Sequence, residues 1–296
     1  MQSKVLAKIA IFGVGLIGGS FALALKKAGA VVHVVGFDRS AEVLARAQQL
    51  GIIDSIAATT AEAVQDADLV LLAVPVAQTE AMLAAITPHL QADTIVTDCG
   101  STKADVVAAA RRALGAKIGQ FVPGHPIAGR ESNGPDAAID HLFAGKKVVL
   151  APLPENAAHD VERVAAAWAH CGAIIHHLGA EQHDLVFAAV SHLPHLLAYA
   201  LVDDIANKPH ADLLFQYAAS GFRDFTRIAG SSPEMWRDIS LANQAALLDE
   251  LDAYMVQLAR MRVALAAGDG AALEAVYANA QKARHDWIKT IEAAER

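Results

Sequence analysis

The chain has few of the residues that mark several large classes of protein. Its 296 residues include two cysteines, Cys99 and Cys171, which form no ligand motif, so we expect a reducing compartment and no disulfide. Lysine and arginine total 24 against 32 aspartates and glutamates, a formal net charge of −8, and basic runs are absent. A nucleic-acid partner is therefore not expected, and an anionic small substrate would need a local cluster of cations.

Long apolar runs are also scarce. An uncharged stretch over residues 9–25 follows Lys4 and Lys8, as in a secretion signal, but four glycines break it and no convincing cleavage site follows. No other segment has about 18 continuous apolar residues, so we expect a cytoplasmic protein without a membrane span. The 54% hydrophobic content allows a large core, and the length favours two domains.

A glycine-rich segment near the start predicts a nucleotide site. A predicted strand at residues 8–12 runs into Gly13-Val14-Gly15-Leu16-Ile17-Gly18, and an apolar helix follows. Gly13 permits the tight turn, Gly15 lets the backbone approach a pyrophosphate, and Gly18 lets the helix pack against the sheet. The positive end of that helix then faces the phosphates. We expect cofactor contacts from Gly13, Gly15, Leu16, Ile17 and Gly18.

The aspartate that follows the second predicted strand indicates which dinucleotide binds. Residues 31–37 lead into Asp38, close to the separation of about 20 residues at which a carboxylate accepts the hydroxyls of the adenosine ribose. This favours NAD over NADP. The neighbouring Arg39 can bind a 2′-phosphate or stack on adenine, so NADP stays an alternative.

The order of predicted elements indicates an α/β fold followed by helices. Further strands are expected at residues 69–74, 94–98, 120–122, 147–151 and 173–178, with helices between most of them. This alternation predicts a Rossmann-type doubly wound parallel sheet over residues 1–178. Residues 179–296 show helical spacing throughout, which predicts an all-α domain. Its high apolar content favours a homodimer through these helices over a compact monomeric bundle.

Ligands of a doubly wound sheet bind beyond the carboxyl ends of its strands. Val74 and Pro75 follow one predicted strand and are expected to contact the cofactor. His125 lies between two prolines on a glycine-flanked loop, where it could accept a proton from a substrate hydroxyl, or simply bond nearby backbone. Ser101 could bond the substrate hydroxyl or the imidazole, or cap a helix.

The helical half carries two histidines on one helical face. His192 and His195 are three residues apart, yet no carboxylate or cysteine stands at a companion spacing, so no metal is expected. We expect one imidazole to face the cleft and the other to be a satisfied structural group.

Cations and an aromatic follow later in the helical half. Arg223 and Arg227 are four apart and could clamp carboxylates along one face, or form a surface network with Asp224 and Asp238. Trp236 could wall the pocket or pack between helices.

Four motifs behind the glycine loop form a recognisable pattern. They are Gly-His-Pro-Ile-Ala-Gly from residue 124, Ser-His-Leu-Pro-His from 191, Phe-Thr-Arg-Ile-Ala from 225 and Met-Trp-Arg-Asp-Ile from 235. With them the chain resembles the prephenate and arogenate dehydrogenases of tyrosine biosynthesis, from about Lys8 to about Leu248. The resemblance implies oxidative decarboxylation: hydride passes to NAD from the hydroxyl-bearing ring carbon, carbon dioxide leaves from the opposite carbon, and the ring becomes aromatic.

The resemblance also implies roles for individual residues. His125 matches the catalytic histidine of the family, and Ser101 matches the serine that assists it at the substrate hydroxyl. Arg227 matches an arginine that binds a substrate carboxylate, and His195 matches a histidine near the substrate side chain.

Three further features follow from the same resemblance. Glu131, with Arg223 or Asp224, looks like part of a gating or orienting ionic network, and Trp236 falls on a motif near the subunit boundary. The family's helical domain forms an intertwined dimer. The chain leaves no room for an added regulatory domain or a fused mutase, which implies a monofunctional enzyme.

Prephenate and arogenate differ only at the side chain, and the sequence leaves prephenate, arogenate or both as substrates. Arg130 departs from the small residue that we expect after the histidine motif, which bears on that side-chain preference. Another hydroxyacid dehydrogenase is an alternative, although it would use a catalytic lysine and Lys208 is the sole helical-half lysine before Lys282. A non-catalytic nucleotide-sensing module is a third alternative.

Overall fold

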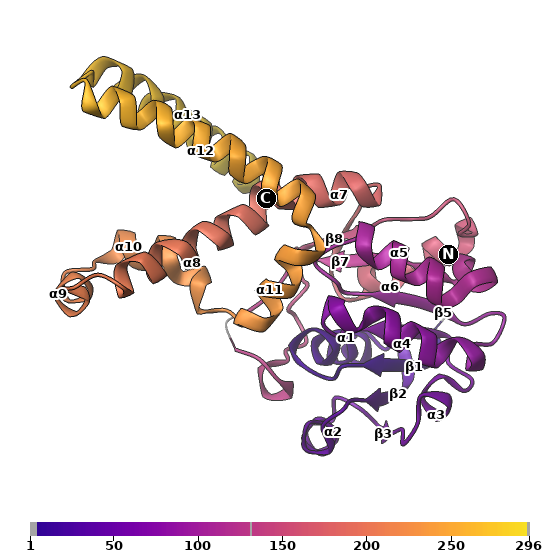
Figure 1. The fold of residues 1–296 in the computed structure, drawn as a ribbon. Coiled ribbons are helices and arrows are strands. Elements are labelled where there is room, and N and C mark those ends of the chain that lie inside the picture. Colours follow the sequence, from indigo (N-terminus) through magenta and orange to yellow (C-terminus); the bar gives the residue numbers. More distant parts are fainter. Residues whose placement is uncertain (1–4, 131, 295–296) are drawn as a thin grey trace. The chain divides into compact units, whose positions relative to one another are not determined.

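The computed structural model describes residues 5–130 and 132–294. The chain forms two compact units, Met1–Gln244 and Ala245–Arg296, and each is described by itself (Figure 1). The first unit contains both sheets and the helices up to residue 242.

The larger sheet has six strands, all parallel, in the order β3-β2-β1-β4-β5-β6. The strands β2 and β3 lie on one side of β1, and the later strands β4, β5 and β6 lie on its other side. The strand order therefore reverses between β1 and β4. This reversal is where a doubly wound sheet binds its ligand. The strands are β1 Leu6–Phe12, β2 Val31–Phe37, β3 Ser55–Ile56, β4 Leu69–Leu72, β5 Ile95–Asp98 and β6 Phe121–Val122.

Helices cover both faces of this sheet, as the alternating pattern predicts. Phe21 and Trp168 pack together on one face with ring centroids 4.5 Å apart, and Leu83 and Val106 belong to the cluster on the other face. The helices are α1 Leu16–Lys27, α2 Ala41–Gln49, α3 Thr60–Val64, α4 Thr79–Ile86, α5 Ala104–Leu114 and α6 Ala158–His170.

A second, three-stranded sheet corrects the prediction of one continuous parallel sheet. It consists of β7 Gly124–Pro126, β8 Lys147–Leu150 and β9 Ile174–His177, with β7 antiparallel to β8. The last two predicted strands therefore exist but belong to this sheet. His125 is also not in a loop, because it pairs with Val149 inside β7. A three-residue strand that ends in proline lacks the alternating pattern that identifies strands.

The rest of the first unit is helical, and among the described residues no strand follows β9, as predicted. A continuous helical segment begins with α7 Ala180–Phe187, passes through a π-helical turn at Ala188–His192 and continues as α8 Leu193–Ala206. Then come α9 Ala211–Gln216, α10 Ser220–Thr226 and α11 Pro233–Ala242.

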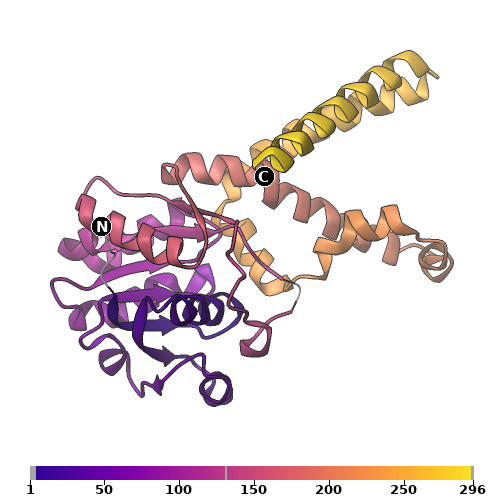
Figure 2. The ribbon, with the colours of Figure 1, turned by 180° about the vertical axis from the view of Figure 1, so that it is seen from behind.

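The second unit is a helical hairpin. The long helices α12 Gln244–Ala266 and α13 Gly270–Ala294 run side by side, as seen from both directions (Figures 1 and 2). They expose several large apolar side chains, including Val263, Leu265 and Trp287.

One described segment, Ala180–Ala206, is long and apolar enough to cross a membrane by length and composition alone. It carries His183, Asp184 and His192, whose side chains are buried and hydrogen-bonded to other parts of the first unit. Lipid would leave such polar groups without partners. Only 28% of the most apolar window of this segment is buried, so it is these polar side chains that attach the helix to the first unit.

Candidate active site

A cavity of about 360 Å³ lies over the carboxyl ends of β1 and β4, where the sheet order reverses. Gly13 turns the chain off β1 with φ of +91°, and a Cβ there would lie 2.4 Å from the carbonyl oxygen of Ala73. A Cβ on Gly18 would lie 2.2 Å from the carbonyl oxygen of Gly13. Both positions therefore require glycine. The lining residues are Gly13, Gly15, Phe37, Asp38, Arg39, Ser40, Val43, Ala73, Val74, Pro75, Gln78 and Met82.

The cavity fits a dinucleotide. A Cβ built on Gly15 meets nothing within 4 Å, so the backbone at this point borders open space in front of the N-terminus of α1. Backbone that is free of side chains beside a helix N-terminus is the arrangement that holds a pyrophosphate. The residues present could therefore hold NAD or NADP.

The carboxylate of Asp38 is fixed at the cavity wall. Oδ2 accepts a hydrogen bond from the backbone N–H of Val14 at 3.2 Å, and Oδ1 accepts one from Ser40 at 3.0 Å. Each oxygen keeps capacity for a further hydrogen bond, as ribose hydroxyls require. Arg39 is exposed and lines the same cavity.

The predicted cofactor residues divide into two groups. Six of them line the cavity: Gly13, Gly15, Asp38, Arg39, Val74 and Pro75. Leu16, Ile17 and Gly18 do not line it, because Leu16 and Gly18 are buried in the first turn of α1 and Ile17 packs against the core.

A buried ion pair connects the loop that carries Ser101 with β7, the strand that carries His125. Lys103 Nζ lies 2.5 Å from Asp98 Oδ2, and both side chains are almost wholly buried. Asp98 also accepts the backbone N–H of Gly100 at 2.7 Å and that of Gly124 at 3.0 Å. One carboxylate at the end of β5 therefore positions the start of β7.

His125 is held by a second carboxylate through another histidine. Its Nδ1 lies 2.8 Å from Nε2 of His183, and Nδ1 of His183 lies 2.8 Å from Oδ1 of Asp184. The oxygens of Asp184 accept the backbone N–H groups of Lys103 and Ala104, each at 2.8 Å. Asp184 therefore caps α5 from a distant helix, and Ser101 does not, contrary to the capping alternative.

His192 is the satisfied structural histidine of the pair. Its side chain is buried, Nδ1 lies 3.1 Å from Nδ2 of Asn243, and the ring also hydrogen-bonds the backbone of Ser101. Asn243 Nδ2 donates to the carbonyl oxygen of Asp184 at 2.8 Å. Ser101 is partly exposed, and its loop is thus fixed from the helical half.

The pKa values of this cluster favour neutral imidazoles. Burial lowers the pKa of His125 well below its usual value, and positive charge on His183 or Lys103 acts in the same direction. Burial also lowers the pKa of His192, to about 4. Burial raises the pKa of Asp184, but hydrogen bonds from His183 and two backbone N–H groups outweigh it and keep the pKa below its usual value.

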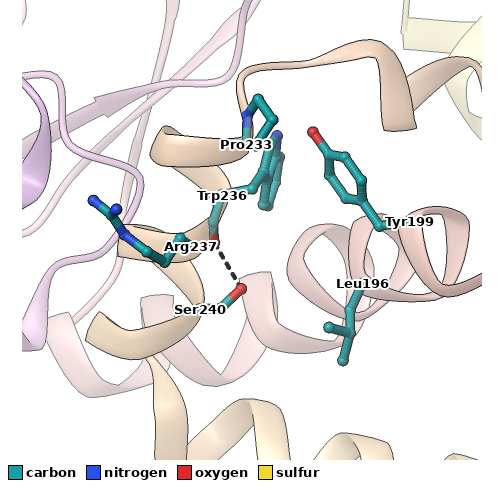
Figure 3. Close-up of a pocket in the computed structure, with 6 residues that line it drawn as sticks. All are labelled: Leu196, Tyr199, Pro233, Trp236, Arg237 and Ser240. Atoms are coloured by element: carbon teal, nitrogen blue, oxygen red, sulfur yellow. Dashed lines mark hydrogen bonds between the residues drawn. The ribbon is translucent and has the colours of Figure 1, made fainter. Parts of the chain in front are cut away.

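A separate cavity of about 240 Å³ lies between α8 and α11 (Figure 3). His195 does not line it but contacts one of the residues that do. Its ring stacks on Trp236 with centroids 3.5 Å apart, and its Nδ1 bonds the carbonyl oxygen of Ser191 at 2.8 Å. Trp236 Nε1 is buried, and no described residue bonds it. The cavity is lined by Leu196, Tyr199, Pro233, Trp236, Arg237 and Ser240.

The two arginines of the helical half lie in different surroundings. Arg223 is exposed, and its Nε lies 3.9 Å from the carboxylate of Asp224. Asp238 pairs instead with Arg237 at 2.7 Å. Arg227 is exposed. Its positive charge lowers the pKa of the nearby His195, although burial of His195 is the larger cause.

Three further residues that the sequence singles out are Glu131, Arg130 and Lys208. Glu131 lies outside the described residues. Arg130 donates to the carbonyl oxygen of Ala137 at 3.1 Å. Lys208, the lysine that a different hydroxyacid dehydrogenase would use, is half-exposed and pairs with Asp204. The described residues contain no metal-ligating cluster.

The sequence reading missed the groups behind His125. Asp98, Lys103, His183, Asp184 and Asn243 received no role, although a His-Asp pair in an otherwise apolar helical segment is a signal that could have identified two of them. The other three hold the loops in place through contacts between distant segments.

Comparison with known proteins identifies the family. A family model for the nucleotide-binding domain of prephenate dehydrogenase matches residues 21–177. Another, for the prephenate dehydrogenase dimerization domain, matches residues 179–279. The chain belongs to the prephenate dehydrogenase family. The resemblance carried by the four motifs is therefore confirmed.

Individual relatives cover nearly the whole chain. Cyclohexadienyl dehydrogenase of Zymomonas mobilis is 41% identical over 93% of this chain and 94% of the relative. Prephenate dehydrogenase of Bacillus subtilis is 38% identical over 86% of this chain and 69% of the relative.

Solved structures of the family share the fold. Aquifex aeolicus prephenate dehydrogenase, in complex with hydroxyphenyl propionate and NAD⁺, aligns with a TM-score of 0.88 at 34% identity, covering 97% of this chain and 100% of that chain. Synechocystis arogenate dehydrogenase aligns with a TM-score of 0.80 at 28% identity, covering 95% and 99%.

The position of Asp38 predicts an effect on cofactor choice. Asp38→Ser should lower the ratio of NAD affinity to NADP affinity about tenfold or more, because hydrogen bonds to a charged group are lost. Fluorescence titration with each reduced dinucleotide measures the ratio. Asp93→Ser, at an exposed carboxylate outside the cavity, is the control and should change neither affinity. An unchanged affinity ratio in Asp38→Ser would show that this carboxylate does not bind the ribose.

The buried histidines predict a loss of stability in acid. Unfolded histidine titrates near pH 6.5, whereas His192 in the folded protein titrates at about 4. The unfolded chain therefore binds more protons between these values, and stability falls as the pH falls. We expect His192 to contribute a loss of about 2 kcal/mol between pH 7 and pH 5, measured by urea unfolding. In His192→Gln the free energy of unfolding should depend less on pH, whereas in His176→Gln, at an exposed histidine, the dependence should be that of the wild type. The same pH dependence in His192→Gln and the wild type would show that His192 is not the cause.

Proposed function

We propose that this chain catalyses the NAD-dependent oxidative decarboxylation of prephenate, of arogenate or of both, in tyrosine biosynthesis. One observation carries the proposal: in a member of this family, His125 stands in a fixed strand, connected by hydrogen bonds to Asp184. The loop of Gly100 and Ser101 reaches from this cluster to the nucleotide cavity, since a Cβ on Gly100 would lie 3.1 Å from Val76, the residue after Pro75.

NAD, when bound, supplies the hydride acceptor. The protein's own work is to hold the substrate against it and to polarise one hydroxyl. We assign pyrophosphate contacts to Gly13 and Gly15, the adenosine ribose to Asp38, and the remaining wall to Val74 and Pro75. The NAD⁺ complex of the Aquifex aeolicus relative supports this choice of cofactor.

We assign proton acceptance at the substrate hydroxyl to His125, assisted by Ser101. The hydroxyl proton moves to the neutral imidazole as the carbon beneath it loses hydride, and a carbonyl forms. Departure of carbon dioxide then leaves an electron pair that aromatises the ring, and the ring oxygen takes the proton back. Substrate and oxidised cofactor thus become a phenol, carbon dioxide and reduced cofactor with no net proton released.

Substrate positioning is assigned to the helical half. Arg227 would pair with a substrate carboxylate, and His195, stacked on Trp236, would lie near the substrate side chain. Glu131 remains a proposed member of an ionic network. The relatives' names include cyclohexadienyl, prephenate and arogenate dehydrogenase, which supports a site that accepts either acid.

We also propose a cytoplasmic homodimer with the domain boundary at residues 178 and 179. The boundary between the two matching family models and the name of the second as a dimerization domain support this. Large apolar side chains that are more than half exposed, such as Leu185, Val190 and Tyr217, are the surface that a second copy would cover.

A direct assay tests the proposed reaction. Purified protein is mixed with NAD or NADP and with prephenate or arogenate, and the reduced nicotinamide is followed by its near-ultraviolet absorbance. Turnover with either acid supports the proposal, and the ratio of the two rates gives the side-chain preference. Cofactor binding without turnover of either acid would refute it and favour another hydroxyacid substrate.

Loss of the imidazole should slow the chemistry more than it weakens binding. We expect His125→Asn to lower kcat about 10²-fold or more while the Kd for NAD changes little, because the proton acceptor is removed and the nucleotide cavity is not. Steady-state kinetics and NAD titration measure the two quantities. His141→Asn, at an exposed histidine, is the control. A kcat near that of the wild type in His125→Asn would show that His125 is not the proton acceptor.

A further inference from the structure

The contacts behind His125 form an unbranched series from a carboxylate to an imidazole. Asp184 contacts His183 at one ring nitrogen, and the other ring nitrogen of His183 contacts Nδ1 of His125. We propose that His183 and Asp184 are positioning residues that hold the proton of His125 on Nδ1 and so keep Nε2 as the bare acceptor. This assignment rests on the proposed function for its role in turnover, but not for its geometry.

The proton positions follow from the acceptor at the start of the series. An ionised carboxylate has no proton to give, so Oδ1 of Asp184 accepts and Nδ1 of His183 must donate. A neutral His183 then has a bare Nε2. At 2.8 Å from His125, that nitrogen accepts, and Nδ1 of His125 must carry a proton.

The remaining ring nitrogen of His125 is thereby determined. In a neutral imidazole only one nitrogen carries hydrogen, so Nε2 is left with its lone pair. None of the described residues hydrogen-bonds Nε2 of His125, whose side chain is only partly buried. This is the nitrogen that can receive a proton from a substrate hydroxyl.

The series is rigid at each member. Asp184 is fixed because both of its oxygens also accept backbone N–H groups at the start of α5. Phe187, one turn further along α7, packs against both imidazoles, with ring centroids 5.0 Å from His125 and 4.4 Å from His183. The rings therefore have little freedom to rotate and exchange their roles.

The charged and titratable groups around His125 support a neutral ring. Lys103 and His183 face it from the start of α5 and from α7, and His192 faces it from the π-helical turn. Asp98 compensates the charge of Lys103 within the same loop. Burial is the largest cause of the lowered pKa of His125. The ring is therefore neutral before it receives the proton of the substrate hydroxyl.

Asp184→Ala gives the sharpest test because it removes the acceptor at the start of the series. An amide would not serve, since Oδ1 accepts from both His183 and the backbone N–H of Lys103, and an amide oxygen at that position would leave the series unchanged. In Asp184→Ala nothing holds the proton of His183 on Nδ1; it can move to Nε2 and donate to His125, whose own proton then moves to Nε2. In serine proteases, loss of the carboxylate behind a catalytic histidine likewise produces the wrong tautomer. We expect kcat to fall about 10²-fold or more with little change in the Kd for NAD.

The spectroscopic readout does not depend on turnover. In protein labelled with ¹⁵N-histidine, the signals of His125, assigned by comparison with His125→Asn, report which nitrogen carries the proton. We expect Nδ1–H alone in the wild type and a share of Nε2–H in Asp184→Ala. Asp105→Asn, at a nearby carboxylate outside the series, should keep both the wild-type tautomer and the wild-type kcat.

A second pair of variants separates positioning from packing. His183→Leu removes the acceptor, whereas His183→Gln keeps an amide oxygen that can accept from His125. We expect the leucine variant to lose about tenfold or more in kcat and the glutamine variant to recover most of it, with the acid limb of the pH profile displaced in the leucine variant.

The outcomes are distinguishable from failure of the proposed function. Absence of turnover in the wild type would refute the proposed reaction, while the tautomer spectrum would still decide the positioning roles. Nε2–H in the wild type, or Nδ1–H alone in Asp184→Ala, would overturn the inference. Equal kcat values for His183→Leu and the wild type would overturn it as well.

Discussion

The buried carboxylate of Asp98 is the contact on which the geometry of the site depends. An ion pair out of water is stable only if its remaining hydrogen-bonding capacity is satisfied. Asp98 meets this condition by binding Lys103 together with the backbone N–H groups of Gly100 and Gly124. These partners lie in the segment after β5 and at the start of β7. The loop of Ser101 and the strand of the catalytic candidate His125 are therefore fixed by one side chain.

Asp184 makes the corresponding connection from the helical half. It caps α5 through Lys103 and Ala104 and bonds His183, while its own carbonyl oxygen accepts from Asn243 at the end of α11. Removal of either carboxylate would leave several buried donors without an acceptor, and each unsatisfied donor costs about 1–3 kcal/mol. The nucleotide-binding and helical parts of the first unit are consequently joined at the point where the chemistry is proposed.

Sequence reasoning succeeded where the signal was local and failed where it depended on distant segments. The glycine turn and Asp38 at the end of β2 each follow from neighbouring residues, and the structure has both. The second sheet was missed because β7 is three residues long and pairs with a strand more than twenty residues away. The cap of α5 was assigned to Ser101 as an alternative because a partner eighty residues distant, Asp184, leaves no mark near the helix.

The two carboxylates act on His125 by different routes but in the same direction, and the proposed reaction uses both. Asp98 cancels the charge of Lys103, which would otherwise make the ring still harder to protonate. Asp184 supports the imidazolium through His183 once the substrate proton arrives. Because the proposed reaction releases no net proton, the ring has to hold that proton only until the aromatic oxygen takes it back. An acceptor with a low pKa suits this task, since it returns the proton readily, whereas a more basic histidine would arrive at the substrate already charged.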